Sequence, residues 1–292
     1  MEEKYIKAGK IAAQALEFGA ALIKPGALAK EICDKTDEKI RELGGEPAFP
    51  AQIALNDTAA HFCPDEEDET ILKDELVSID VGVHVDGFIG DNARTIDLSG
   101  KNQELVKASR EALMNAIAFI KPGVTFGEIG KVIHDTITKY GFSPVRNLSG
   151  HGLDEYDVHT KPTVPNYDNG DETKVEEGMV FAIEPFASAG AGIIYESSNG
   201  TIFQLYDKKP TRNMITRQII KEIETYHALP FCSRWLQRKF GIGKTRMALK
   251  EMKMLGMIKE YPPLIDQNHG LVSQAEHTVI IRKDKAEILT TI

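Results

Sequence analysis

The chain has 292 residues, of which 42% are hydrophobic and 27% charged, a balance that excludes fibrous and intrinsically disordered classes. Its start, MEEKYIKAGK, lacks the basic segment and apolar run of a signal peptide, and no apolar stretch approaches the roughly 20 residues of a membrane-spanning helix. We therefore expect a cytoplasmic protein that makes no membrane contact. Cys33, Cys63 and Cys232 form no CxxC pair, which argues against a disulfide framework or a thiolate zinc site, so oxygen and nitrogen atoms would hold any metal.

Residues 10–44 and 107–141 look like two copies of one segment. The tetrapeptide IKPG occurs at 23–26 and again at 120–123, and a gapless alignment at this offset of 97 residues makes 12 of 35 positions identical. In each copy a helix ends at the Pro-Gly pair and a second helix follows, over about 27–43 in the first copy and 126–140 in the second. The chain therefore predicts an internal duplication.

The stretch LVSIDVGVHVDGFIGDNART, residues 76–95, predicts a β-hairpin. Valine and isoleucine alternate from 77 to 85 and share one face of the first strand, and Asp86-Gly87 favours a two-residue turn. That turn places Gly82 opposite Asp91 and Asp80 opposite Ala93. Both aspartates then lie on one face, with backbones roughly 7–8 Å apart and almost no side chain between them, which leaves room for a cation. An exposed polar face of an antiparallel sheet would explain the same pattern.

Each helical pair is followed by predicted strands. The hairpin follows the first pair, and EEGMVFAIEPF, residues 176–186, follows the second and is interpreted as one strand. The segment HGLVSQAEHTVIIRKDKAEILTTI is interpreted as terminal strands. We expect an α+β fold with two related halves, in which helices cover a shared antiparallel sheet. A site at the seam between the halves would take ligands from both.

Residues 201–260, called the insert below, differ in charge from the rest of the chain. They hold 13 Lys/Arg and 5 Asp/Glu, a balance of +8, which leaves −17 for the remainder because the total is −9. Three short helices are predicted, over 215–226, 233–240 and 244–258, with a Gly-Ile-Gly turn between the last two, as in a helix-turn-helix. We expect 1–200 with 261–292 to form one domain and 201–260 a helical subdomain. Its basic surface fits a polyanion, or is simply solvated.

Three more residues are candidate ligands. His151 lies between glycines in SGHGLDEYDVH, Glu184 lies in the strand VFAIEPF, and Glu276 lies at the head of the final apolar strand in SQAEHTVII. Buried carboxylates need a counter-charge. Taken singly, each residue is better explained by an ion pair or a sheet edge than by a ligand role, so a metal site requires that they converge with Asp80 and Asp91.

The full set of motifs resembles the methionine aminopeptidases, specifically their type 2 branch, whose fold is called pita-bread. The matching motifs are IDVGVHVDGFIGDNA, GHG, FAIEPF and AEHT, in that order, and the resemblance covers essentially the whole chain. The insert looks like the type 2 insertion, and its helices resemble those of a winged helix. The resemblance implies a pseudo-two-fold pita-bread domain that binds two divalent ions, which could be cobalt, manganese, iron or zinc.

The resemblance also implies roles for individual residues. Asp80 would hold one metal, His151 and Glu184 chiefly the other, and Asp91 and Glu276 would bridge the two. Glu184 would in addition carry the proton, and His61 and His159 would hydrogen-bond the substrate and the developing oxyanion. The methionine pocket would be lined by Phe49, His61, Val158, His159, Phe186 and Tyr261. Without the resemblance, His61 would be interpreted as a surface residue and Phe49 and Phe186 as ordinary core residues.

The implied function is removal of the initiator methionine from nascent proteins and peptides with a small second residue (Gly, Ala, Ser, Thr or Val). The alternative is a non-catalytic nucleic-acid or ribosome-associated protein of the same fold. In either case the insert could bind the ribosome or its RNA through phosphate contacts. A competing hypothesis is that the insert only walls the methionine pocket through Tyr261 and that its charge balances the acidic remainder.

Overall fold

The computed structural model describes residues 1–197 and 199–292. Its helices are α1 (Glu2–Leu22), α2 (Ala29–Glu42), α3 (Gln103–Phe119), α4 (Phe126–Lys139), α5 (Met214–Ile223), a 3-10 turn η1 (Glu224–Tyr226), α6 (Ser233–Phe240) and α7 (Ile242–Met254). Among these helices, none combines the length and the apolar character that spanning a bilayer requires.

The strands are β1 (Glu46–Pro47), β2 (Gln52–Leu55), β3 (Thr58–Ala60), β4 (Leu76–Val85), β5 (Phe88–Asp97), β6 (Ser143–Pro144), β7 (Ser149–Asp154), β8 (Asp157–Pro165), β9 (Val180–Ile183), β10 (Phe186–Ser188), β11 (Ile194–Glu196), β12 (Ile202–Leu205), β13 (Phe231–Cys232), β14 (Ile258–Tyr261), β15 (Leu264–Asp266), β16 (Val272–Ile281) and β17 (Ala286–Ile288). Eleven of them form one sheet, whose main path runs β1-β4-β5-β16-β9-β7-β8. All of the pairings within it are antiparallel.

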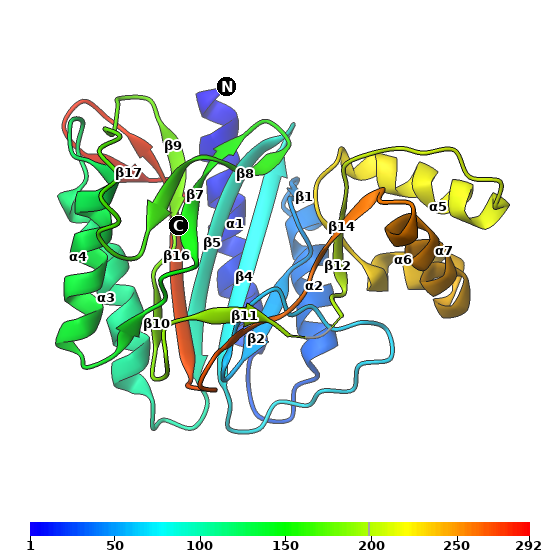
Figure 1. Ribbon diagram of the computed structural model, residues 1–292, viewed down its shortest axis with the longest axis horizontal. Coiled ribbons are helices and arrows are strands. Elements are labelled where there is room, and N and C mark those ends of the chain that lie inside the picture. Colours follow the sequence, from blue (N-terminus) through cyan, green and yellow to red (C-terminus); the bar gives the residue numbers. More distant parts are fainter. Residues whose placement is uncertain (198) are drawn as a thin grey trace.

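Helices α1 and α2 cover one half of the sheet, and α3 and α4 cover the other (Figure 1). Helix α1 contacts β4 and β5, α3 contacts β16 and α4 contacts β8, so the two halves meet where β5 pairs with β16. This arrangement confirms the predicted α+β architecture. Strands β5 and β16 carry the candidate ligands Asp91 and Glu276. These two ligands therefore lie at the seam between the halves.

The predicted duplication is also visible in the backbone. Gly26 and Gly123 both have positive φ, and so do Gly44 and Gly141, each pair separated by the predicted 97 residues. The turns after α1 and α3 make matching bonds: the Gly26 N–H donates to Leu72 O, and the Gly123 N–H donates to Val175 O. Glycine accepts the left-handed conformation at no steric cost, so the repeated Pro-Gly stop ends the first helix of each half in the same way.

Each half has its own hydrophobic core. In the first half the apolar face of β4 packs against α1 and α2, with Val77, Ile79, Val81 and Val83 buried. In the second half β16 and β9 pack against α3 and α4 around Phe126 and Phe181. The period-two pattern of β4 therefore puts Ser78, Asp80 and Gly82 on the opposite face, away from the helices.

Two strand predictions were wrong in detail. The strand predicted over 176–186 is divided into β9 and β10, and Glu184 lies at the break between them. The next residue, Pro185, has no N–H to donate to a ladder, so the pairing is interrupted there. Glu276 was expected at the head of the final strand, but it lies in the middle of β16. Glu276 thus stands within a strand of the sheet, whereas Glu184 lies between two strands.

The insert carries the three expected helices and projects from the side of the sheet (Figure 1). Helix α7 starts at Ile242, two residues before the predicted start, because Gly241 alone, at φ +88, makes the turn. The insert also has a sheet in the order β13-β12-β14 and a separate hydrophobic core that includes Phe203, Phe231 and Leu236. These features support the subdomain boundary at 201–260, which stays a prediction.

Candidate functional site

The hairpin β4–β5 has the predicted register. Asp80 faces Ala93 and Gly82 faces Asp91, and the turn residues Asp86 and Gly87 both have positive φ. The space beside Gly82 is filled by an aromatic ring: a Cβ at this position would lie 2.1 Å from a ring carbon of Phe49. Only glycine therefore allows Phe49 to pack onto the strand beside the two aspartates.

Strand β16 completes one row of the site across the seam. Glu276 pairs with Ala93 from the side opposite to Asp80, so a methyl group separates the two carboxylates along the row. Residue Thr278, two positions further along β16, anchors the neighbouring aspartate: its Oγ1 donates to Asp91 O (2.9 Å) and accepts from Asp91 N (2.8 Å). The three strands therefore present Asp80, Asp91 and Glu276 from one continuous surface.

His151 and Glu184 approach from the second half. His151 lies on β7 between Gly150 and Gly152, where a Cβ would lie 2.3 Å from Ala182 O and 2.1 Å from Lys161 O respectively. The flanking glycines thus let β7 pack closely between β9 and β8. The ring Nδ1 donates to Gly152 O (3.3 Å), which leaves Nε2 facing Asp91 and Glu276, each with an oxygen at 3.9 Å.

The five candidate ligands form two overlapping groups. Ligand atoms of Asp91, His151 and Glu276 lie within 4.8 Å of one another, and so do those of Asp80, Glu184 and Glu276. Glu276 belongs to both groups, whereas Asp91, the other residue expected to bridge the ions, belongs only to the first. Glu184 groups with Asp80, whereas the family resemblance implied that it would pair chiefly with His151. The five residues converge on one site, but the division of ligands between two ions stays a prediction.

The electrostatics of this cluster favour a bound cation. Burial raises the pKa of Asp80 to about 7, and burial followed by the charges of neighbouring carboxylates raises the pKa values of Asp91, Glu184 and Glu276 well above the ordinary range. Asp80 Oδ1, Asp91 Oδ1 and both Glu276 oxygens are buried without a hydrogen-bond partner among the described residues. Burial, followed by the charge of His159, lowers the pKa of His151 to about 3, so its ring stays neutral. Four carboxylates and a neutral imidazole fit a divalent transition-metal ion.

Sequence reasoning missed two buried glutamines that hold the site in place. Gln274 donates its amide to Glu184 Oε1 (2.7 Å). Gln52 lies opposite Asp80 on β2, and its Oε1 accepts the backbone N–H of His61 (2.9 Å). The signal for Gln274 was its position two residues before Glu276, which puts both side chains on one strand face. No motif or periodic pattern in the sequence around Gln52 indicated a role for it.

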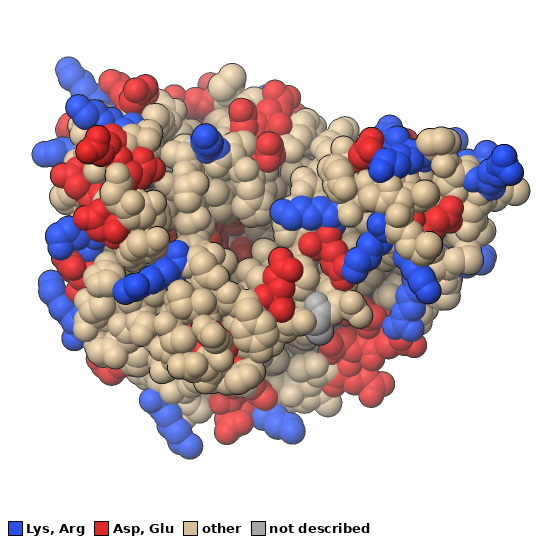
Figure 2. All heavy atoms as spheres, viewed as in Figure 1, with Lys and Arg blue, Asp and Glu red and all other residues tan. Residues whose placement is uncertain are grey.

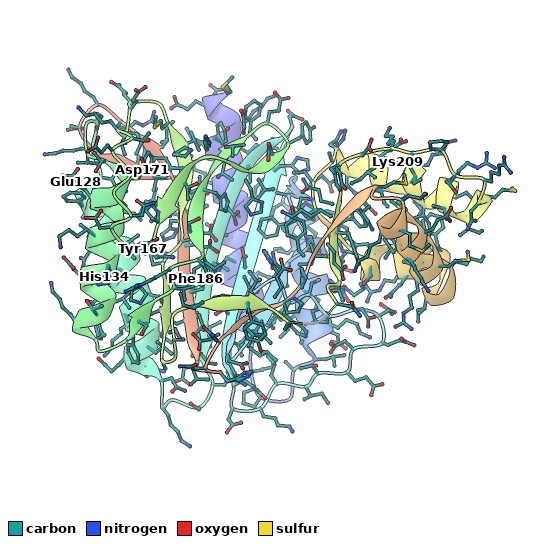
Figure 3. All side chains as sticks on the ribbon, viewed as in Figure 1. Glu128, His134, Tyr167, Asp171, Phe186 and Lys209 are labelled. Carbon is teal, nitrogen blue, oxygen red and sulfur yellow. The ribbon has the colours of Figure 1, made fainter. Side chains whose placement is uncertain are left out.

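A cavity of about 240 Å³ opens beside the carboxylates. All six predicted pocket residues line it: Phe49, His61, Val158, His159, Phe186 and Tyr261. Figure 2 shows acidic atoms at the floor of a hollow near the middle of this face. Figure 3 locates Phe186 over the sheet, between α4, marked by His134, and the insert, marked by Lys209.

Two histidines stand beside the carboxylate cluster in this cavity. The ring centroid of His159 lies 4.6 Å from that of His151, and the ring centroid of His61 lies 5.4 Å from that of Tyr261. Burial is the main reason why the pKa of each, His61 and His159, falls to about 4. Both are therefore neutral near pH 7, and each can donate one hydrogen bond and accept another.

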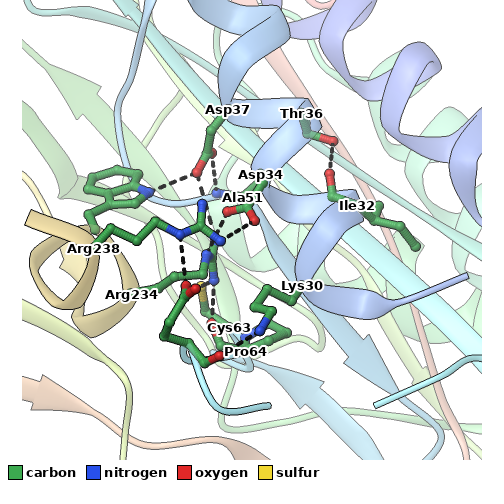
Figure 4. Close-up of polar contacts among 12 residues, drawn as sticks. Lys30, Ile32, Asp34, Thr36, Asp37, Ala51, Cys63, Pro64, Arg234 and Arg238 are labelled. Atoms are coloured by element: carbon green, nitrogen blue, oxygen red, sulfur yellow. Dashed lines mark hydrogen bonds and ion pairs between the residues drawn. The ribbon is translucent and has the colours of Figure 1, made fainter. Parts of the chain in front are cut away.

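The insert docks onto the first half through ion pairs, of which those of Arg234 are buried (Figure 4). The fully buried Arg234 donates from Nε to Asp34 Oδ1 (2.7 Å) and from Nη1 to Cys63 Sγ (3.2 Å). Arg238 bonds Asp34 (2.6 Å) and Glu66 (2.7 Å), and Arg246 pairs with Asp65 and Glu67 in the same acidic loop.

These ion pairs favour the hypothesis that part of the insert's charge balances the acidic remainder. Figure 2 shows blue and red side chains adjoining at this boundary. Arg234, Arg238 and Arg246 are bound to carboxylates, so they are unsuitable positions for testing RNA binding by charge reversal. Reversing Arg234 would break a buried contact and disturb the fold.

Comparison with known proteins gives consistent matches. The family model described as Metallopeptidase family M24 matches residues 3–226. The methionine aminopeptidase of Archaeoglobus fulgidus is 44% identical over 292 residues, covering 99% of this chain and 98% of that protein. That of Thermococcus onnurineus is 43% identical over 291 residues, covering 99% of each. A crystal structure of methionine aminopeptidase from Thermotoga maritima matches with a TM-score of 0.74 and 26% identity, covering 99% of this chain and 96% of that one.

Proposed function

This chain belongs to metallopeptidase family M24, and on that basis we propose that it is a methionine aminopeptidase that removes the N-terminal methionine from nascent proteins and peptides. The pita-bread fold expected from the motifs is confirmed by the family match and by the likeness to the Thermotoga maritima structure. The observation that carries the proposal is the convergence of four carboxylates and His151 beside an apolar-walled cavity. We assign the chain to the type 2 branch because of its insert.

The residues that would hold metal are Asp80, Asp91, His151, Glu184 and Glu276, and we propose two divalent ions. The charges support that number, because four carboxylates carry −4 and two divalent ions carry +4. Bound there, divalent ions would supply Lewis-acid chemistry, which polarises a peptide carbonyl and acidifies a water. The protein holds the carboxylates of Asp80, Asp91 and Glu276 at fixed separations, because they lie on the hydrogen-bonded strands β4, β5 and β16.

Glu184 is the proposed carrier of the proton. Gln274 occupies its Oε1, so Oε2 is the oxygen that takes a proton from water and passes it to the leaving amine. Water thus supplies a hydroxyl to the methionyl carbonyl and a proton to the new N-terminus, as peptide hydrolysis requires. His61 and His159, neutral and facing the cavity, donate hydrogen bonds to the substrate and to the oxyanion that develops.

The cavity suits a single unbranched side chain. Its apolar walls come from Phe49, Val158, Phe186 and Tyr261, which stand beside the carboxylates. A thioether side chain packs well against aromatic rings and adapts to an irregular slot. We propose that this slot selects methionine and that the second residue of the substrate must be small.

Turnover of short peptides tests the proposal. The purified protein, freed of metal and then loaded separately with Mn²⁺, Fe²⁺, Co²⁺ or Zn²⁺, is expected to release methionine from Met-Ala-Ser but not from acetyl-Met-Ala-Ser, and to act poorly on Met-Leu-Ser. Metal analysis is expected to find two ions per chain. Absence of methionine release with every one of these ions would contradict the proposal.

Ribosomal RNA binding by the insert is a separate hypothesis. It rests on fewer cations than the net charge suggests, because several basic residues of the insert are paired with carboxylates. Exposed cations for which no carboxylate lies within ion-pair distance in the described chain include Arg212, Arg217 and Lys244. Reversing these three to glutamate should lower co-sedimentation with ribosomes at low salt while leaving tripeptide hydrolysis intact. Unchanged co-sedimentation would leave the insert as a wall of the pocket, which is the competing hypothesis.

A further inference from the structure

The substrate chain beyond the scissile bond must leave the cavity through an opening. A second hollow, of about 490 Å³, adjoins the cavity, and the two share His61, Asn147, Leu148, His159, Tyr261 and Leu264. We call this hollow the vestibule. A different groove, lined by Arg41 and His84 of the first half and Tyr226 of the insert, shares only Pro230 with the cavity. The vestibule is therefore the continuous route along which the third and later residues of a peptide would lie.

A lysine side chain stands at the mouth of the cavity in this vestibule. Lys259 is exposed on β14, and its Nζ lies 4.3 Å from the ring centroid of Tyr261, which itself lines both hollows. In the described part of the chain no carboxylate lies within ion-pair distance of this ammonium, whereas Lys253 nearby is paired with Glu260. Lys259 is thus a cation that the protein leaves available to a bound peptide.

The charge of Lys259 reaches the two pocket histidines. Burial is the main cause of the low pKa of His61, and burial followed by His61 is the cause for His159, but Lys259 lowers both pKa values further. Glu196 and Glu260 also line the vestibule, and Glu260 is paired with Lys253. Neither carboxylate is among the main influences on the pKa of either histidine. Among the charged residues of the vestibule, Lys259 is therefore the one whose charge acts on the two pocket histidines.

We propose that Lys259 determines specificity downstream of the cleaved bond, favouring substrates that carry a carboxylate at the third or fourth residue. This inference rests on the proposed aminopeptidase function. An exposed ion pair of this kind contributes a modest free energy, so the expected preference is about two- to fivefold in kcat/KM. Because the contact lies away from the reacting atoms, the effect should fall mainly on KM and should weaken as salt rises.

Peptides that differ in one side chain test the proposal. The series Met-Ala-Xaa-Ala-Ala and Met-Ala-Ala-Xaa-Ala, with Xaa as Asp, Asn or Lys and with amidated C-termini, isolates the charge of one position. The wild-type protein should prefer Asp over Asn and Asn over Lys at low salt. Lys259→Gln should bring these ratios close to one, and Lys259→Glu should invert them. Lys250→Gln, an exposed lysine of α7 outside the vestibule, is the matched control and should keep the wild-type ratios.

Each result separates this inference from the function on which it rests. Hydrolysis of the Asn peptides tests the aminopeptidase activity by itself. If those peptides are cleaved and the Asp:Asn ratio is the same in the wild type and in Lys259→Glu, the role of Lys259 is overturned while the function stands. A wild-type preference for Lys peptides would overturn it as well, because Glu196 would then govern the vestibule.

Discussion

Glu276 has a central position among the candidate metal ligands. It belongs to both ligand groups, and its two buried oxygens have no hydrogen-bond partner among the described residues. Glu276→Gln keeps the shape but removes the charge that a divalent ion requires. Turnover should fall by more than about 100-fold, beyond the usual loss for residues that only orient a ligand. Asp91→Asn should behave in the same way.

The measurement for these variants is kcat/KM at stoichiometric metal, with thermal unfolding of the metal-free proteins as the control. The metal-free variants should be at least as stable as the wild type, because an amide avoids both the burial of a charge and the repulsion by neighbouring carboxylates, which together raise the pKa of Glu276. Activity near that of the wild type would contradict the bridging role.

The protonation state of His84 is expected to make the stability of the hairpin turn depend on pH. The Gly87 N–H donates to His84 Nδ1 (3.2 Å), so the ring must stay neutral at that nitrogen. Burial, with a smaller contribution from His227, lowers the pKa of His84 to about 4, from an ordinary value of 6.5. The unfolded chain therefore gains a proton below pH 6.5 that the folded protein does not take up until about pH 4. This contribution to stability is complete above pH 6.5 and is lost as the pH falls toward 4.

In the variant His84→Gln this acid-sensitive contribution is absent. The unfolding temperature, measured from pH 7 to pH 4.5 in the presence of a chelator, should fall less steeply than in the wild type. Identical slopes for the two proteins would show that His84 does not couple the turn to pH.

Helix α6 is held to the first half by Arg234, whose guanidinium is fully buried beside Asp34 and Asp37. Arg234→Met fills similar space but leaves buried carboxylates without their counter-charge, which typically costs about 3–5 kcal/mol. The matched control is Arg238→Met on the same helix, since Arg238 is partly exposed and its ion pairs contribute roughly 0–1 kcal/mol. Urea unfolding of both variants measures the difference. Equal losses would mean that the contact of α6 with the first half does not depend on the buried charge.

The whole sheet is expected to depend on metal for part of its stability. The ligands come from both halves, so a bound ion links β4 and β5 to β7, and the metal-free protein keeps a cluster of mutually repelling carboxylates. A ligand at about 100 times its Kd adds roughly 2.7 kcal/mol. A chelator should therefore lower the unfolding temperature, and Mn²⁺ or Co²⁺ should restore it. The double variant Asp80→Asn/Glu276→Gln should no longer respond to either; a retained response would place metal binding elsewhere.

Several features of this protein follow from sequence alone because they depend on neighbours along the chain. The Asp86-Gly87 turn sets the register of β4 with β5, and so puts Asp80 and Asp91 on one face whatever the rest of the molecule does. The duplicated Pro-Gly stops end α1 and α3 at matching positions by the same local chemistry. The motifs around the five candidate ligands named the family correctly, since they are short and lie in a fixed order.

Only the tertiary structure decided what depends on contacts between distant segments. The grouping of Glu184 with Asp80 arises from the break at Pro185 and the bond from Gln274, neither of which has a periodic signal. The net charge of the insert suggested a free basic surface, yet Arg234 is buried against α2, about 200 residues away in the chain. Charge counts and strand patterns are properties of neighbouring residues, whereas burial and pairing are set by which surfaces meet when the two halves and the insert pack together.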